Sequence, residues 1–193
     1  MKETVFGTIA FILFAVYDLE QAGAVSHRFH KIVKYFFTLG SVILLAATGL
    51  LLWKTVPLIM PPSGKQILFL LLAGVFLLLL IYTLFFALPF EETYVTQDAH
   101  RIYDKKMYAL CRHPGVLWFA GTYFSLWLMF GTMPWLAMAV WFSFLNFCYI
   151  VLQDHYTFPK IFSDYADYKK RVPFLIPNGK SFKRCLETFK ESR

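Results

Sequence analysis

The stretch that most constrains the fold runs from Pro114 to Gln153, 40 residues without one charged side chain. A helix needs about 20 apolar residues to cross the hydrocarbon core of a bilayer, so this stretch is long enough for two crossings. Gly131 and Pro134 lie near its middle, where they favour a tight turn followed by a helix that starts with proline. The stretch therefore predicts a helical hairpin that crosses a membrane twice.

The composition predicts the same class of protein. Hydrophobic residues make up 58% of the chain and charged residues only 16%, with a mean hydropathy of +0.54, which is too apolar for an ordinary soluble domain of this length. Further uncharged runs lie before the hairpin, and the first of them is expected to continue as helix through Asp18 and Glu20 to the membrane surface. We predict an all-α integral membrane protein that forms a single domain over residues 1–193. The five expected transmembrane helices cover residues 4–22, 36–58, 67–90, 114–131 and 134–153.

Basic residues predict the orientation, since lysine and arginine are retained on the cytoplasmic side during insertion. With the N-terminus outside, 16 of the 19 basic residues fall on the inner side, and the outer side keeps only Lys2, Lys54 and Lys65. The predicted orientation is N-terminus outside and C-terminus cytoplasmic. The net charge of +7 is then explained by orientation and by attraction to membrane lipids, and no motif indicates nucleic acid. The compact length favours a prokaryotic plasma membrane.

Two cytoplasmic segments, Glu91–Arg112 and His155–Arg193, are too polar to span. The second carries aromatic residues that are mostly three to four positions apart, which would place them on one face of a helix. These residues are Tyr156, Phe158, Phe162, Tyr165 and Tyr168. We therefore predict a cytoplasmic interfacial helix over Tyr156–Arg171.

The cysteines and histidines do not form a metal-binding pattern. The three cysteines, Cys111, Cys148 and Cys185, are odd in number and have unrelated spacings, so neither a disulfide framework nor a zinc site is expected. His27 and His30 are flanked by basic residues and fit a solvated loop. No metal site is predicted.

Three features between Met107 and Pro177 occur in an order that resembles a known family. The sequence Y-A-L-C-R-H-P at Tyr108–Pro114 precedes the hairpin, Asp154 follows it, and the tail reads F-S-D-Y-A-D-Y-K-K-R-V-P-F-L-I-P at Phe162–Pro177. This half of the chain is similar to the C-terminal half of the isoprenylcysteine carboxyl methyltransferases and the related phospholipid methyltransferases. The first three spans match that family only in number and in being apolar.

The resemblance implies a methyltransferase that uses S-adenosylmethionine and acts on a lipophilic acceptor. The cofactor would lie at the cytoplasmic face, between the start of the fourth span and the tail, and the acceptor would enter from the bilayer. The implied catalytic residues are Arg112 and Asp154. The implied cofactor-binding residues are Tyr108, Leu110, His113, Pro114, Phe162, Tyr165 and Tyr168.

Elementary chemistry is compatible with this assignment but leaves the acceptor open. Pro114 interrupts the backbone hydrogen bonds where a helix begins, so nearby amides are free to bind polar atoms. Methyl transfer is an in-line displacement that depends mainly on alignment. A prenylcysteine carboxylate needs a cation to hold it, for which Arg112 is suited. A phospholipid amine must instead lose a proton, which Asp154, His155 or His113 would accept.

The chain also departs from the family pattern, and two alternatives follow. The family reads Arg-His-Pro-x-Tyr-x-Gly and has paired glutamates after the hairpin, whereas this chain has Val116, Trp118 and Gln153 at the corresponding positions. One alternative is therefore a membrane protein that retains the fold without catalysis. The other is an NADPH-dependent enzyme similar to sterol reductases, whose 2′-phosphate would require cations such as those at residues 169–171.

Overall fold

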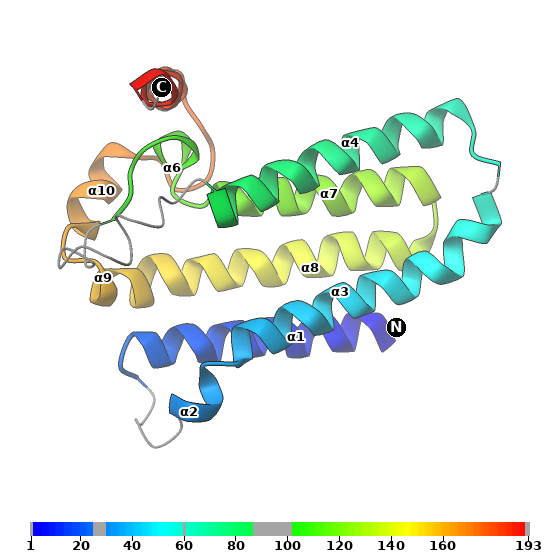
Figure 1. Ribbon diagram of the computed structural model, residues 1–193, viewed down its shortest axis with the longest axis horizontal. Helices are drawn as coiled ribbons and strands as arrows, with labels where there is room; N and C mark the ends of the chain where they lie inside the picture. The colour runs from blue at the N-terminus through cyan, green and yellow to red at the C-terminus, as the bar shows by residue number, and fades with distance from the viewer. Residues whose placement is uncertain (1, 25–29, 60, 87–101, 192–193) are drawn as a thin grey trace.

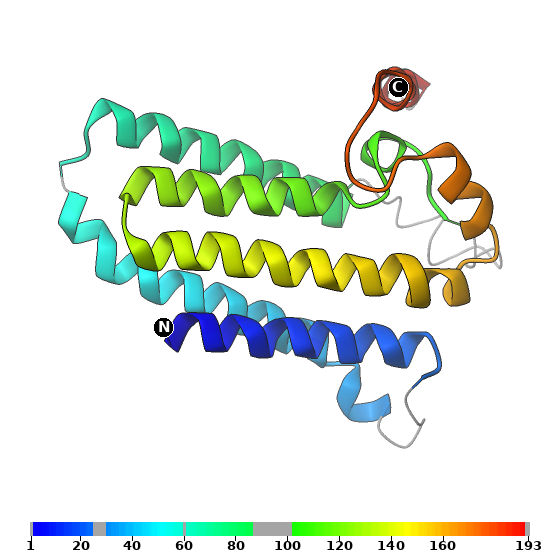
Figure 2. The same cartoon turned by 180° about the vertical axis from the view of Figure 1, so that it is seen from behind.

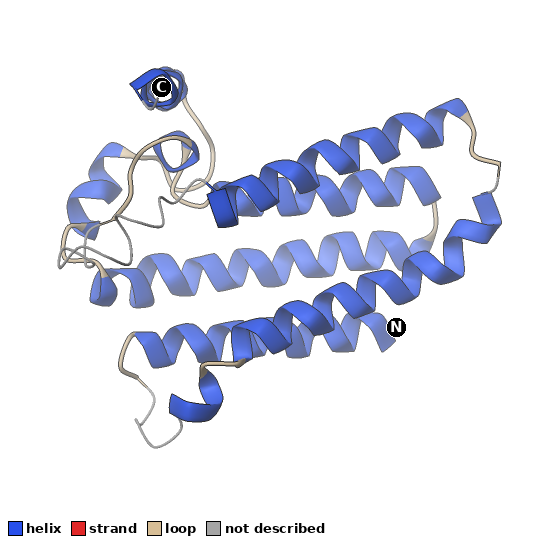
Figure 3. Cartoon of the chain, in the orientation of Figure 1, coloured by secondary structure: helices blue, strands red, loops and turns tan. Residues whose placement is uncertain are grey.

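The computed structural model describes residues 2–24, 30–59, 61–86 and 102–191, and all regular elements in these ranges are helical (Figure 3). Five long helices lie side by side, with successive long helices running in opposite directions (Figure 1). They are α1 (Lys2–Gln21), α3 (Phe36–Thr55), α4 (Gly64–Ile81), α7 (Pro114–Phe130) and α8 (Met133–Leu152). The predicted all-α class is confirmed for the described residues.

The hairpin formed by α7 and α8 is the centre of the fold. α4 packs against α7, α1 packs against α8, and α3 packs against α1, an order that is visible from both sides of the molecule (Figures 1 and 2). Trp135 and Phe142 of α8 are fully buried in the core between these helices. The indole Nε1 of Trp135 donates a 3.1 Å hydrogen bond to Oγ1 of Thr55, which joins α8 to α3.

The helix boundaries agree closely with those predicted. Gly131 has φ +66°, the left-handed conformation that ends α7, and Pro134 is in the first turn of α8, so the turn lies where it was expected. α4 begins at Gly64, three residues earlier than predicted, because Ser63 and Gln66 form a capping box. A π-helical turn at Tyr82–Phe86 continues α4, and the last residues of the predicted third span, 87–90, lie outside the described residues.

Three helical stretches are long and apolar enough to cross a membrane: His30–Thr55, Gly64–Phe86 and Met133–Ile161. α7 is also apolar but has only 17 residues. α1 has 20 residues and carries charged side chains near both ends. The described residues thus form five long helices, of which three meet this length and composition by themselves.

The short helices gather at one end of the long ones, the left end in Figure 1. They are α2 (His30–Val33), α6 (Met107–Leu110), α9 (Phe158–Ile161), α10 (Tyr165–Arg171) and α11 (Gly179–Glu191). The N-terminus, the α3–α4 connection and the α7–α8 turn lie at the opposite end. This arrangement brings the start of α7, the end of α8 and the tail together.

The single interfacial helix predicted over Tyr156–Arg171 is wrong. A π-helical turn at Gln153–Thr157 continues α8 directly into α9, the chain leaves the helix at Phe162 with φ −107° and ψ 118°, and α10 begins at Tyr165. The break allows the rings of Phe158 and Phe162 to pack against the cluster of Tyr165, Tyr168 and Val172. A single straight helix could not bring these side chains together in one cluster.

Candidate functional site

The side chain of Asp154 is the centre of a buried polar cluster. Asp154 lies in the π-helical turn that continues α8, and it is 1% exposed. Its Oδ1 lies 3.0 Å from Nη1 of Arg112 and accepts a 2.6 Å hydrogen bond from the hydroxyl of Tyr165, and its Oδ2 lies 2.8 Å from Nζ of Lys169. Two cations and one carboxylate give the cluster a net positive charge. The start of α7, the end of α8 and α10 each supply part of it.

His113 extends the cluster toward an aromatic wall. It immediately precedes α7 but makes no side-chain cap, and its Nε2 lies 3.4 Å from Oδ1 of Asp154. Its ring is stacked on Phe158 with centroids 5.8 Å apart and meets the ring of Phe174 edge-on at 5.3 Å. Burial lowers the pKa of His113, although the hydrogen bond to Asp154 opposes this shift. The imidazole is therefore neutral at neutral pH.

Hydrogen bonds to the backbone hold the Arg-His-Pro segment against the tail. The amide of Arg112 donates to the carbonyl of Pro173 at 2.9 Å, and the hydroxyl of Tyr168 donates to the carbonyl of Tyr108 at 2.8 Å. Tyr108 in turn donates to the carbonyl of Thr83 at 3.1 Å, which joins the segment to the end of α4. Burial raises the pKa of Tyr108 to about 12, so it remains a donor over the physiological range.

The structure brings most, but not all, of the predicted site residues together. Arg112, His113, Asp154 and Tyr165 share one set of contacts. Tyr108 and Tyr168 brace the backbone beside them, Phe162 packs on the tyrosines of α10, and Pro114 is the first residue of α7. Leu110 differs, because it packs with Ala109 and Cys185 under α11, in a separate cluster that includes Trp118. Whether these residues bind a cofactor stays a prediction.

Sequence reasoning missed two contributors, Lys169 and Phe174. Lys169 was named only among the cations that a 2′-phosphate would require, but its Nζ contacts both the carboxylate of Asp154 and, at 3.2 Å, the carbonyl of that residue. Its spacing of four residues from Tyr165 places both on one face of α10, which is a signal in the sequence. Phe174 lies 5.3 Å from the guanidinium of Arg112, a cation–π contact that no spacing indicated.

The departures from the family pattern lie around the cluster, not within it. Gln153 donates a 2.7 Å hydrogen bond to Asp18 and so faces α1. Trp118 stacks on Phe76 of α4 with ring centroids 6.3 Å apart. Val116 is buried.

Two buried polar atoms near Asp154 have no hydrogen-bond partner among the described residues. They are Nε of Arg112 and Oγ1 of Thr157. An unpaired buried polar group costs about 1–3 kcal/mol, so such atoms are uncommon and call for an explanation. The orphaned Nε of Arg112 fits a ligand that brings an acceptor oxygen, above all a carboxylate, because Arg–carboxylate pairing is commonly bidentate.

Two surface hollows lie away from this cluster. One is beside α11, and the other, of about 620 Å³, is an apolar groove between α1 and α8 that is lined by residues such as Val5 and Val140. Within the described ranges, no group of three or more histidine, cysteine or acidic side chains is arranged to hold a metal ion.

Comparisons of the chain with protein-family models, curated proteins and solved structures find no match. Function is therefore inferred from the residues of the cluster and their geometry.

Proposed function

We propose that the chain is an integral membrane protein with five spans, an outer N-terminus and a cytoplasmic C-terminus. α1 and α7 run alongside the three helices that are long and apolar enough to span, so all five would cross the same layer (Figure 1). The 17 residues of α7 extend over about 26 Å at about 1.5 Å per residue, close to the hydrocarbon thickness. Leu45, Trp53 and Leu71 project from the bundle with more than half of their surface exposed, as lipid-facing residues would.

We propose further that the Asp154 cluster belongs to an S-adenosylmethionine-dependent methyltransferase acting on a lipophilic acceptor. The observation that carries this proposal is the buried, unpaired Nε of Arg112 inside a net-positive cluster with aromatic walls. Such a site fits a ligand that combines a carboxylate with an aromatic ring. If bound here, the cofactor would supply the methyl group of its sulfonium to the nucleophilic atom of the acceptor and would be left as a neutral thioether.

Each residue of the cluster has a distinct role in this proposal. Arg112 binds a carboxylate through Nε, the donor that has no partner among the described residues, and Asp154 holds the guanidinium through its Nη1. Asp154 is itself a poor base, because Arg112 and Lys169 both stabilise its ionised form. It is therefore a positioning residue, and His113 is the better proton acceptor of the two.

The geometry favours a carboxylate acceptor over an amine. A carboxylate acceptor is already nucleophilic and needs no base, whereas an amine acceptor must first lose a proton to an available base. Of the two buried candidate bases, Asp154 is ionised but weak as a base and His113 is neutral, and Nε2 of His113 lies 3.4 Å from Oδ1 of Asp154. A prenylcysteine-like carboxylate is thus the preferred acceptor, with a phospholipid amine as the second.

The reductase alternative receives less support from the cations of α10. Lys169 pairs with Asp154 at 2.8 Å, Lys170 with Asp167 at 2.8 Å, and Arg171 with Asp104 at 2.9 Å. Each cation thus has an acidic partner within the chain. A 2′-phosphate would have to displace these partners, so methyl transfer remains the preferred function.

Titration calorimetry of the full chain in nanodiscs with S-adenosylhomocysteine tests the proposal. We expect micromolar binding that Arg112→Gln weakens at least tenfold, since hydrogen bonds to charged groups contribute about 1.5–3 kcal/mol. Arg171→Gln makes the same change at a half-exposed guanidinium and should leave binding intact. Binding of NADPH in place of S-adenosylhomocysteine would support the reductase, and binding of neither would support a non-catalytic protein.

A further inference from the structure

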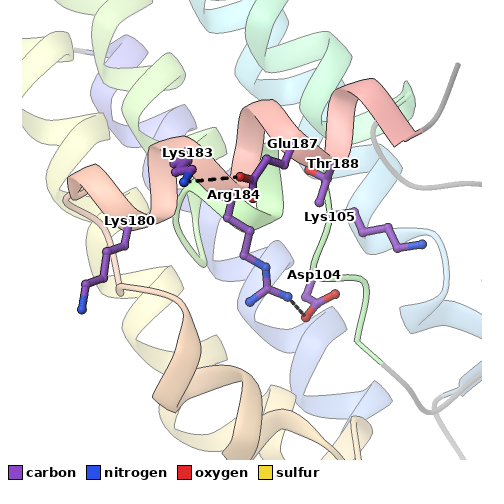
Figure 4. A pocket seen from close by; sticks show the side chains of 7 residues that line it. All are labelled: Asp104, Lys105, Lys180, Lys183, Arg184, Glu187 and Thr188. Atoms are coloured by element: carbon purple, nitrogen blue, oxygen red, sulfur yellow. Dashed lines mark hydrogen bonds and ion pairs between the residues drawn. The ribbon is translucent and has the colours of Figure 1, made fainter.

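The hollow beside α11 has a basic lining that the proposed methyl transfer does not use. It measures about 510 Å³ and lies between α11 and the loop that precedes α6 (Figure 4). Four cations line it, Lys105 from the loop and Lys180, Lys183 and Arg184 from α11, against the two carboxylates of Asp104 and Glu187. The lining therefore carries a net charge of +2.

The carboxylates do not neutralise the lysines. Asp104 is engaged by two guanidinium groups, at 2.7 Å from Arg184 and 2.9 Å from Arg171. Glu187 approaches Lys183 only to 3.9 Å, and the two side chains are 56% and 80% exposed. Lys105 and Lys180 are exposed, and neither is paired with another side chain of the described ranges. The lysine ammonium groups are thus available to an anion that enters from solvent or from a lipid surface.

Both walls of the hollow are fixed to each other before any ligand binds. The amide of Lys106 donates to Oγ1 of Thr188 at 2.9 Å, and the ion pair of Asp104 with Arg184 adds a second link. Lys106 has φ +53°, an uncommon conformation for a lysine, which these links help to maintain. Cys185 packs against α6 from the buried side of α11. A preorganised site loses less entropy when a ligand binds.

The other flank of α11 is apolar and exposed. Phe182 and Leu186, one helical turn apart, are 56% and 49% exposed. A helix with basic residues beside exposed phenylalanine and leucine is typical of one that lies in a membrane surface. The basic hollow would then lie at the depth of lipid phosphates, which are attracted to lysine and arginine there.

From these observations we infer that the hollow lined by Lys105, Lys180, Lys183 and Arg184 binds a phosphate group. The exposed apolar flank of α11 favours the headgroup of an anionic phospholipid as its source, and free phosphate is the other source with the same chemistry. Lysines bind phosphate as compact point charges, so the basic side chains that line the hollow are suited to this ligand. The inference does not depend on methyl transfer, because none of these residues contacts the Asp154 cluster.

The test uses the full chain in detergent and three probes: dioctanoyl phosphatidic acid, dioctanoylglycerol without a phosphate, and inorganic phosphate. We expect phosphatidic acid to bind and dioctanoylglycerol not to bind at the same concentration. The double variant Lys180→Gln/Lys183→Gln should weaken binding roughly tenfold to thirtyfold, since each cation contributes about 1 kcal/mol near a membrane surface. The loop variant Lys105→Gln should weaken it less.

The matched control is Lys31→Gln/Lys34→Gln, which removes two exposed lysines, one in α2 and one in the turn that follows it, at the same end of the molecule. The control should bind phosphatidic acid as the wild type does, and both double variants should keep the wild-type thermal unfolding because all four side chains are exposed. Inorganic phosphate that binds as tightly as phosphatidic acid would assign the site to free phosphate. Equal affinities in the wild type and the Lys180→Gln/Lys183→Gln variant would overturn the inference.

Discussion

The hydroxyl of Tyr165 donates a 2.6 Å hydrogen bond to Oδ1 of Asp154, and this bond joins α10 of the tail to the end of α8. Both side chains are 1% exposed. Burial, followed by the hydrogen bond to Asp154, raises the pKa of Tyr165, so the phenol stays protonated at physiological pH. The candidate site is therefore complete only when the tail is docked on the helical hairpin.

Replacing Tyr165 with phenylalanine removes this donor and keeps the ring. The ring contacts with Phe158 and Tyr168 remain possible, but Asp154 loses one of its partners inside the protein. We expect the free energy of unfolding to fall by about 1–3 kcal/mol, measured by chemical denaturation in detergent. Tyr156→Phe, at a side chain that is 37% exposed, is the matched control and should change little. Equal stabilities for the two variants would show that the hydrogen bond does not stabilise the docked tail.

His113 predicts a pH dependence of stability. Its folded pKa is lowered by burial, whereas the unfolded imidazole titrates near its usual value of about 6.5. Below a pH of about 6.5, the unfolded state therefore binds more protons than the folded state. The stability that is present above this pH is lost as the pH falls toward the folded pKa of His113. A single titrating proton changes the free energy of unfolding by at most about 1.4 kcal/mol per pH unit.

His113→Gln separates this effect from other titrations between pH 7.5 and 5. Glutamine still offers a neutral donor to Asp154 but cannot be protonated, so the slope of unfolding free energy against pH should become shallower. Arg112 and Lys169 also face this part of the cluster, because both pair with Asp154. His155→Gln, at a side chain that is 69% exposed, is expected to retain the wild-type slope. A wild-type slope in His113→Gln would contradict a buried neutral imidazole.

The sequence was sufficient to locate the long helices, because an uncharged run that is long enough to cross a membrane seldom forms anything other than a helix. Gly131 and Pro134 marked the α7–α8 turn for the same reason, since each residue type has a narrow backbone preference. α11 was not predicted, although Phe182, Cys185, Leu186 and Phe189 follow a helical spacing. The basic residues between them lower the hydropathy of the segment, so the helical spacing of its apolar residues was not recognised.

The candidate site was predictable only in part. Arg112, His113 and Asp154 are polar residues beside long apolar helices, where few positions are polar, so they stood out in the sequence. The role of Lys169 depended on where α10 begins, and the contact of Phe174 with Arg112 depended on the path of the chain after α10. Both are consequences of tertiary packing, which residue spacing alone does not determine.

Gly121 gives a test of the packing between α7 and α4. A Cβ atom at this position would lie 2.7 Å from Cγ of Phe76, and Cγ is the inner end of the ring, so Phe76 or the helix must move. We expect Gly121→Ala to lower the free energy of unfolding by about 1–3 kcal/mol. Gly74→Ala is the matched control, because a Cβ there meets no atom within 4 Å and alanine favours the helix by up to about 1 kcal/mol. Similar effects of both substitutions would mean that α4 and α7 pack less closely at Gly121 than the structure shows.

The proposed orientation predicts opposite labelling of the two ends of the bundle. Lys65 in the first turn of α4 and Lys160 in α9 are both exposed and lie at opposite ends of the long helices (Figure 1). In a Cys148→Ala background, the remaining cysteines, Cys111 and Cys185, are buried. A membrane-impermeant maleimide should then label Lys65→Cys in intact cells but label Lys160→Cys only after lysis. The reverse pattern would show that the chain is inserted the other way round, with the Asp154 cluster facing outward. Equal labelling of both variants in intact cells would contradict spanning itself, because an intervening bilayer must shield one end.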